Sequence, residues 1–266
     1  MAMKKARLAA FSGRNRMKPI VAAALAAAFA ALAAAPALAQ NEGDYLYRVE
    51  TLRAAPGKFE ALLDWAASAR AAGYYEAGGR PFPFLMRHSQ GDQWDLLVIL
   101  PMESWASFHA PAKEKKRAAA AAAHRALLDA QDGLIAFEED LFAYGPPLET
   151  LRSAYAESGL FHIEMFAAAP GKQDALLEQR RMENAYLAAT GQTTNMIFRR
   201  AAGSDVDVFT IGFHNNLESF AAPGAMSDAE KEAAAKAAGF KDRADISFYL
   251  RSLIASHHDT LATKPR

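Results

Sequence analysis

An internal repeat constrains the fold of this chain more than any other feature of its sequence. The tetrapeptide Ala-Pro-Gly-Lys at residues 55–58 recurs at residues 169–172. Around it, further identities recur at the same offset: Leu46, Glu50, Leu62 and Leu63 match Leu160, Glu164, Leu176 and Leu177. Beyond a two-residue length difference the matches continue, with Arg87, Gly91, Asp95, Ile99, Ser107, Phe108 and Pro111 on Arg199, Gly203, Asp207, Ile211, Ser219, Phe220 and Pro223. The fold must therefore be built from one unit used twice.

Both copies have the same predicted order of elements. Alternating aromatic and branched residues predict strands, and apolar residues at helical spacing predict helices. In the first copy these are strand 45–52, helix 59–72, strands 84–88 and 94–100, helices 103–109 and 113–130, and strand 134–142. In the second they are strand 161–166, helix 173–188, strands 195–199 and 206–212, helices 217–220 and 228–238, and strand 246–254. The order βαββαβ, found twice, predicts an α+β fold of two tandem ferredoxin-like units.

The N-terminal segment has the pattern of an export signal. Residues 1–39 contain basic but no acidic side chains, and an uncharged, alanine-rich run over 20–35 precedes Ala-Leu-Ala at 37–39. These are the three parts of a signal peptide. We therefore expect a periplasmic or secreted protein that is cleaved after Ala39 and is not stably inserted in a membrane. An uncleaved membrane anchor is the alternative, and Met17 is a second candidate for the first residue. The predicted domains are a signal peptide at 1–39, a first unit at 40–147, a linker at 148–157 and a second unit at 158–266.

Charge and cysteine content exclude several functions. The whole chain has 30 basic and 30 acidic side chains, but all six basic residues of the leader are lost on cleavage, which leaves a net charge of −6. An acidic protein is poorly suited to bind nucleic acid. The chain has no cysteine, which excludes disulfides, thiolate metal sites and thiol nucleophiles. Because 52% of its residues are hydrophobic, the chain can still bury a substantial core without disulfides.

The first strand and turn resemble those of a known family. Tyr-x-x-Arg-x-x-Thr-Leu at residues 45–52, followed by Pro-Gly-Lys at 56–58, resembles the opening of NIPSNAP-type domains. The strand, turn and helix are similar to the wider dimeric α+β barrel superfamily, which includes antibiotic-biosynthesis monooxygenases and chlorite-dismutase-like haem proteins. This resemblance implies that the two copies pack sheet to sheet as a pseudo-dimeric barrel within one chain. The superfamily includes cofactor-free oxygenases, haem enzymes and proteins of unknown role, so it implies no single reaction.

Polar residues alternate along the first strand of each copy. Tyr47, Val49 and Thr51 match Phe161, Ile163 and Met165, and we expect this apolar face to contact the helices. The opposite face carries Leu46, Arg48 and Glu50 in the first copy and Leu160, His162 and Glu164 in the second. If it faces the barrel interior, the candidate catalytic residues are His162, Glu164, Arg48 and Glu50. Arg48 would hold a carboxylate or enolate, and His162 or Glu164 would accept a proton. The alternative is that each pair only neutralises its own charge.

Other residues are weaker candidates for a ligand site. Arg87 and Arg199 recur at equivalent strand positions and could reach an anionic ligand, although an exposed cation at a strand end explains them as well. Trp94, His109 and His214 are the remaining candidates, and the resemblance to haem proteins makes His109 a possible haem ligand, although the second copy does not repeat it. A helix-terminal histidine without a ligand explains His109 and His214 as well. We expect no metal site, because His257-His258-Asp259 fits a solvated tail, and no bound cofactor apart from haem.

Three functions remain open. The first is an exported protein that binds a small organic molecule without converting it. The second is a cofactor-free monooxygenase-like or isomerase-like enzyme that uses His162, Glu164 and Arg48. The third is a structural or assembly scaffold. The sequence does not decide whether the protein is an enzyme, nor its oligomeric state.

Overall fold

The structure is a computed structural model that describes residues 42–90, 93–222 and 224–265. The predicted leader lies outside this part of the chain, as does Gly91 of the predicted hairpin turn. The described residues belong to one compact unit. Among the described residues, no helix combines the length and the apolar character that crossing a membrane would require.

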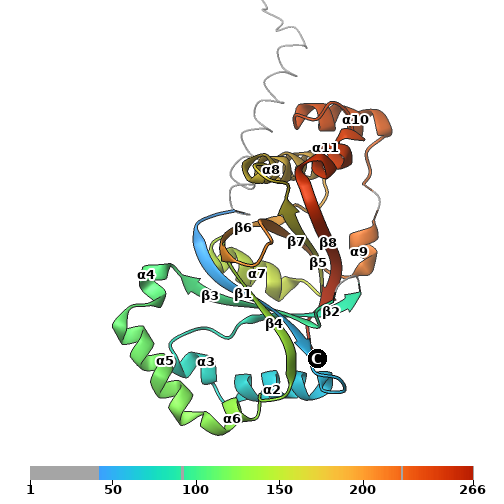
Figure 1. Cartoon of the computed structure of the whole chain (residues 1–266). Coiled ribbons are helices and arrows are strands. Elements are labelled where there is room, and N and C mark those ends of the chain that lie inside the picture. The colour runs from blue at the N-terminus through green and yellow to red at the C-terminus, as the bar shows by residue number, and fades with distance from the viewer. Residues whose placement is uncertain (1–41, 91–92, 223, 266) are drawn as a thin grey trace, which may run out of the picture. The chain divides into compact units, whose positions relative to one another are not determined.

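The first repeat contains four strands, and its helices lie between them in the chain (Figure 1). Its elements are β1 (Tyr45–Ala54), α2 (Phe59–Ala71), α3 (Tyr74–Ala77), β2 (Phe84–Gln90), β3 (Leu96–Glu103), α4 (Trp105–Phe108), α5 (Pro111–Ala123), α6 (Arg125–Asp129) and β4 (Ile135–Gly145). The helix predicted over 113–130 is two helices, because the chain leaves helical geometry at His124. The segment predicted as a linker forms α7 (Leu148–Glu157).

The second repeat has the same strand order as the first. Its elements are β5 (Leu160–Ala168), α8 (Gln173–Ala189), β6 (Met196–Gly203), β7 (Val208–His214), α9 (Leu217–Ala221), α10 (Asp228–Ala237), α11 (Asp245–Leu253) and β8 (Ile254–Thr263). The prediction of a last strand at 246–254 is wrong. Residues 246–253 belong to α11, and residues 254–263 form the strand. His257, His258 and Asp259 therefore belong to β8 and not to a solvated tail.

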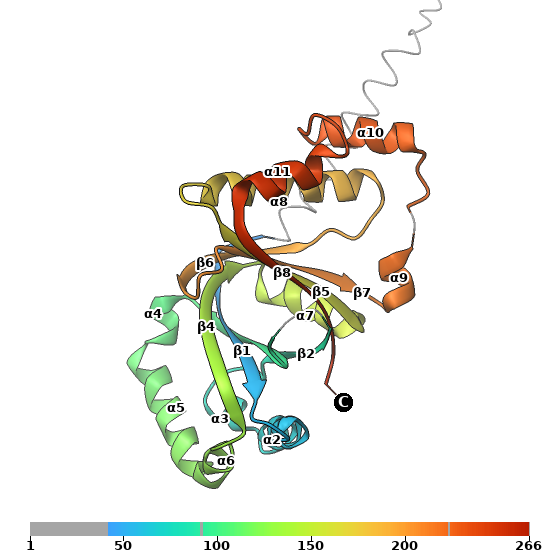
Figure 2. The same cartoon turned by 45° about the vertical axis from the view of Figure 1, so that its right-hand side comes forward.

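The eight strands close into one antiparallel barrel in the order β1-β3-β2-β8-β5-β7-β6-β4. Within a repeat, the first strand lies between the third and the last, as β1 does between β3 and β4. Two pairings join the repeats: β4 pairs with β6, and β8 pairs with β2. The fold is thus α+β, with two tandem ferredoxin-like units that form a pseudo-dimeric barrel within one chain (Figure 2).

The barrel interior is apolar. One cluster of buried residues takes members from all eight strands, which only the inside of a closed barrel can bring together. It includes Tyr47 and Val49 of β1 and Phe161 and Ile163 of β5. The predicted orientation of the first strands is therefore wrong: their apolar faces point into the barrel, and Arg48, Glu50, His162 and Glu164 point toward the helices.

Helices cover the outer faces of the two half-barrels. Against the first repeat, α2 packs through Ala66 on a cluster with Leu85 and Val98. Against the second, α8 and α11 pack through Leu177 and Leu250 on a cluster with Ile197 and Val208. Because the sheet is covered on both sides, polar side chains between strand and helix are held in a partly buried layer. This layer contains the candidate site.

Candidate functional site

A cavity of about 440 Å³ lies between the sheet of the second repeat and α8. Four parts of the repeat form its walls. The strands contribute His162 and Glu164 from β5 and His214 from the end of β7, and α8 contributes Glu183. The remaining lining comes from the segment between α8 and β6, with Asn195, and from α9 and the residues after it, with Phe220 and Ala222. Two of the predicted catalytic residues therefore share a cavity, but between sheet and helix and not inside the barrel.

His162 forms a pair with Asp259 of the neighbouring strand. Its Nε2 lies 2.6 Å from Oδ1 of Asp259, because β8 runs beside β5 and places Asp259 directly opposite Glu164. Burial lowers the pKa of His162, but the hydrogen bond with Asp259 and the charges of Glu164, Asp259 and Glu183 outweigh burial, so its pKa is raised. The hydrogen bond with His162 also lowers the pKa of Asp259. The pair thus favours an imidazolium beside a carboxylate.

Glu164 is held from two sides. Its Oε2 accepts a hydrogen bond from the Thr210 hydroxyl of β7 at 3.1 Å and faces Nη1 of Arg180 at 3.4 Å. Thr210 lies directly opposite Glu164 in the β5–β7 ladder, so both side chains project from the same face of the sheet. The carboxylate is therefore fixed in orientation at the cavity wall.

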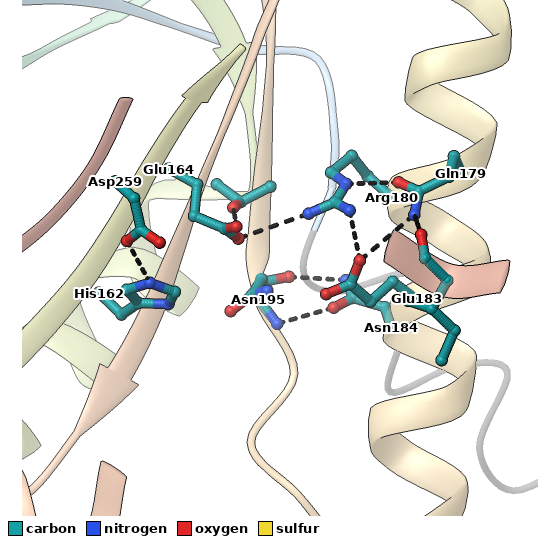
Figure 3. A network of polar contacts seen from close by, with 10 residues as sticks. His162, Glu164, Gln179, Arg180, Glu183, Asn184, Asn195 and Asp259 are labelled. Atoms are coloured by element: carbon teal, nitrogen blue, oxygen red, sulfur yellow. Dashed lines mark hydrogen bonds and ion pairs between the residues drawn. The ribbon is translucent and has the colours of Figure 1, made fainter. Parts of the chain in front are cut away.

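Arg180 is a buried cation that sequence reasoning missed. Its side chain is 1% exposed, and its guanidinium contacts Glu183 and Oε1 of Gln179 as well as Glu164 (Figure 3). The ring of Phe166 lies 4.7 Å from the guanidinium carbon. Burial raises the pKa of Glu183 although Arg180 opposes the shift. A buried cation is stable only when charged or polar partners surround it. The partners of Arg180 come from both elements, so it links α8 to β5 beside the cavity.

An asparagine and a glycine shape the rest of the wall. Asn184 of α8 exchanges two hydrogen bonds with the backbone of Asn195, at 2.7 and 2.8 Å, and so fixes the entry to β6. Gly212 lies beneath the side chains of Asn195 and His214, and a Cβ built there would lie 2.8 Å from Oδ1 of Asn195 and 2.9 Å from Nε2 of His214. A larger residue at Gly212 would therefore displace the side chains of Asn195 and His214.

His214 differs from His162 in its surroundings. Its Nδ1 is buried and, within the described part of the chain, has no hydrogen-bond partner. Burial, and next the charge of His162, lower the pKa of His214. Its ring packs edge-on against Phe220 at 5.1 Å. The cavity thus contains two imidazoles whose pKa values are shifted in opposite directions.

In the first repeat, the equivalent positions form an ion cluster. Arg48 contacts Glu50 at 2.9 Å, Glu138 at 3.2 Å and Asp140 at 2.6 Å. Asp140 lies opposite Glu50 in the β1–β4 ladder, just as Asp259 lies opposite Glu164 in the second repeat. Burial, the largest effect, raises the pKa of Glu50 to about 7, although Arg48 lowers it. Arg48 and Glu50 are therefore in direct contact, as the alternative for this pair supposed, but burial keeps the Glu50 carboxyl partly protonated near neutral pH.

The cavity beside this ion cluster is smaller. It measures about 190 Å³ and is lined by Arg48, Glu50 and several large side chains, among them Trp65, Tyr75 and Arg80. Arg48 and His162 belong to different repeats, so the structure separates the four predicted catalytic residues into two pairs. Only the pair from the second repeat lines the larger cavity.

The other predicted ligand residues lie elsewhere. Trp94 is buried in the barrel interior, and Arg87 packs over the ring of Phe59 at 5.6 Å. Arg199 packs over Tyr144 and approaches Asp44 at 3.4 Å. His109 follows α4, is half exposed, and pairs with Glu114 at 3.1 Å. Of the five predicted ligand-binding residues, only His214 lines the 440 Å³ cavity.

The charge of the cavity lining disfavours haem, although the imidazoles of His162 and His214 line the cavity. His109, the haem ligand implied by the resemblance, does not line it. The described lining contains the carboxylates of Glu164 and Glu183 but no lysine or arginine. Arg180 is buried behind the wall and faces those carboxylates. Two haem propionates would therefore meet negative charge without a cationic partner, which is unfavourable in a partly buried site.

Comparison with known proteins identifies the fold. A scan against models of known protein families finds no match, and neither does a search of curated proteins. Among solved structures, an anthrone oxidase-like protein matches 85% of this chain and 94% of its own, with a TM-score of 0.55 and 14% identity. A chlorite dismutase variant from Candidatus Nitrospira defluvii matches 84% of this chain and 92% of its own, with a TM-score of 0.44 and 12% identity. A haem-binding protein from Thermus thermophilus matches 84% and 91%, with a TM-score of 0.41 and 10% identity. The chain is thus similar in fold to the anthrone oxidase-like protein over nearly all of its described length.

Proposed function

We propose that the protein binds a small organic molecule in the cavity between β5, β7 and α8. One observation carries the proposal: the cavity of about 440 Å³ has the volume of small-molecule sites, whereas the equivalent region of the first repeat is less than half as large. Polar groups that fix an orientation line it together with apolar side chains that would bury a ring system. A pure scaffold has no need for this asymmetry between its repeats.

The lining indicates the chemistry of the ligand. Leu187, Phe220 and Ala222 offer apolar contact, and Asn195, Glu164 and Glu183 offer acceptors for hydrogen bonds. Because the described lining has carboxylates and no lysine or arginine, it favours an uncharged or cationic molecule that donates hydrogen bonds over an anion. A hydroxylated aromatic compound has these properties. The anthrone oxidase-like structure suggests anthrone and 1,8-dihydroxyanthrone as probes.

A bulky side chain at the cavity mouth tests the proposal. Ala222 is exposed and lines the cavity, so Ala222→Trp should fill it without disturbing the core. We expect isothermal titration calorimetry to show binding of 1,8-dihydroxyanthrone to the wild type and a loss of affinity of at least about tenfold in Ala222→Trp. The neighbouring variant Ala221→Trp is the matched control, because Ala221 is exposed but does not line the cavity. Equal loss in both variants, or no binding to the wild type by any probe of this class, would favour a scaffold instead.

A second candidate is an enzyme that moves a proton without a cofactor. The observation that favours it is the His162–Asp259 pair at the cavity wall, with Nε2 and Oδ1 2.6 Å apart. A carboxylate beside an imidazole stabilises the imidazolium that forms when the ring accepts a proton. His162 would then deprotonate an acidic carbon or hydroxyl group of the bound molecule. Solvent deuterium exchange into anthrone should be accelerated by the wild type and not by His162→Gln, whereas exchange equal in the two proteins argues for binding alone.

We also propose that the chain is exported and cleaved after Ala39. The support is the basic, acid-free leader and its alanine-rich apolar run. N-terminal sequencing of the protein recovered from the periplasm or the medium should begin at Gln40. Recovery of the intact leader in a membrane fraction would show an anchored protein.

A further inference from the structure

The structure points to a binding site for one divalent transition-metal ion on the second repeat, formed by His162, Glu164 and Asp259. We propose that the site binds an ion such as Zn²⁺ or Mn²⁺ at the wall of the cavity. The proposal goes beyond ligand binding and does not depend on it, since the cavity can bind an organic molecule with or without the ion.

The three side chains are arranged as ligands are in metal sites. One ligand atom from each lies within 4.8 Å of those of the other two. His162 and Glu164 are two residues apart on β5 and share a face, and Asp259 on β8 lies directly opposite Glu164. Ligands at about 2.1 Å from an ion stand about 3.0–3.5 Å apart, so the His162–Asp259 contact has to open by less than about 1 Å. One imidazole with two carboxylates is a donor set that selects transition metals over Mg²⁺ and Ca²⁺, which prefer oxygen alone.

The first repeat provides an independent observation. There the equivalent carboxylates, Glu50 and Asp140 with nearby Glu138, are held together by the guanidinium of Arg48, which lies 2.6–3.2 Å from all three. The position of Arg48 is occupied by His162 in the second repeat. The protein thus places a fixed cation among the carboxylates on one side and a metal-binding side chain at the same place on the other. A divalent ion held by His162 would provide the charge that Arg48 provides in the first repeat.

The surroundings would orient the ligands and leave room for exchange. Thr210 and Arg180 both contact Oε2 of Glu164, so Oε1 is the atom that we expect to bind the ion. The side chain of Asp259 is 53% exposed, which gives an ion access from solvent, and His162 and Glu164 line the cavity. An ion there has coordination positions directed away from the three protein ligands. A neutral imidazole that binds an ion through Nε2 carries its proton on Nδ1 and has no free lone pair, so the metal site and proton transfer by His162 exclude each other.

The two repeats allow a test by exchange of residues. Untagged protein is treated with EDTA, dialysed, and titrated with ZnCl₂ and MnCl₂ by isothermal titration calorimetry. We expect one equivalent of metal per chain in the wild type. His162→Arg should reduce the affinity at least about 100-fold, because a ligand is lost and a fixed cation takes its place. This variant reproduces the arrangement of the first repeat, so we expect it to fold, and circular dichroism should show that it does.

The converse substitution, made in the first repeat, provides a second test of the metal site. Arg48→His places an imidazole among Glu50, Glu138 and Asp140 and should raise the stoichiometry from one to two. Glu139→Gln, at a partly exposed position of β4 whose side chain points to the opposite face from Glu138 and Asp140, is a control that should leave the stoichiometry at one.

Wild-type protein that binds no stoichiometric metal, or His162→Arg that binds as the wild type does, would overturn the proposal. A single equivalent in Arg48→His would contradict the equivalence of the two positions on which it rests. Binding of 1,8-dihydroxyanthrone is measured separately, so failure of one proposal does not imply failure of the other.

Discussion

The carboxyl group of Glu50 illustrates how individual charges are buried between sheet and helices. Its side chain is 14% exposed, and its pKa is raised from 4.5 to about 7 because burial outweighs the attraction of Arg48. Between these two values the folded protein retains a proton that the unfolded chain has lost. The free energy of unfolding therefore falls as the pH rises from about 4.5 to 7, and the full cost of the buried charge is present above pH 7.

Replacing Glu50 by glutamine should remove this cost. Arg48 keeps its contacts with Glu138 and Asp140 in the variant, so no cation is left unpaired. We expect Glu50→Gln to be more stable than the wild type at pH 8 by on the order of 1–3 kcal/mol, and to differ little at about pH 4.5. Urea denaturation at both pH values measures the difference. Glu60→Gln, at an exposed position of α2, is the control; a stability gain that is independent of pH would contradict the explanation.

Three of the site residues, His162, Glu164 and His214, can be found from sequence and others cannot. His162 and Glu164 stand out because polar side chains inside a strand are unusual, and both line the cavity. Arg180 and Glu183 belong to α8, where charged residues normally face solvent, so nothing in the pattern separates them from the surface. In sequence, Asp259 follows two histidines near the C-terminus and resembles part of a tail. Only the pairing of β8 with β5 reveals it as the partner of His162.

At the scale of elements, the period of a strand is easier to predict than its orientation. Alternation in β1 correctly groups Tyr47 with Val49 and Arg48 with Glu50. Both faces of the strand are covered, one by the barrel interior and one by helices, so apolar content does not tell which face is which. The size of the side chains distinguishes the two faces. The aromatic rings of Tyr47 and Phe161 fill the interior cluster, and the polar residues lie on the other face, where helix side chains and solvent can form hydrogen bonds and ion pairs with them.

The last strand shows a different limit. Residues 246–254 are rich in branched and aromatic side chains, which favours a strand, yet α11 forms there and buries Leu250 and Leu253 against the second repeat. The true strand, β8, begins with a largely exposed stretch that includes His257 and His258. Its place is determined by pairing with β5 and β2, which are distant in sequence. Long-range pairing overrides local propensity in such a strand.

At the scale of the molecule, the two repeats complete each other. Strands β4 and β8 each pair with a strand of the other repeat, and the interior cluster draws on both. A single repeat would expose two unpaired strand edges and half of an apolar core, which favours aggregation.

Separating the repeats tests this dependence. Fragments 40–157 and 158–266 should be insoluble or self-associated when expressed alone and should form a 1:1 complex when co-expressed. Size-exclusion chromatography with light scattering distinguishes these outcomes. Two fragments that are each folded and monomeric would show that barrel closure is not needed for stability.

Joining the two half-barrels in one chain has a consequence for how the molecule can change. In a barrel made of two identical subunits, every substitution appears twice, and a residue that suits one face must be tolerated on the other. Here each position is encoded once, so arginine and histidine can occupy matching places, and one half can keep a compact ion cluster while the other keeps a larger cavity. Covalent linkage thus frees the two faces from symmetry, and selection can act on one without altering the other.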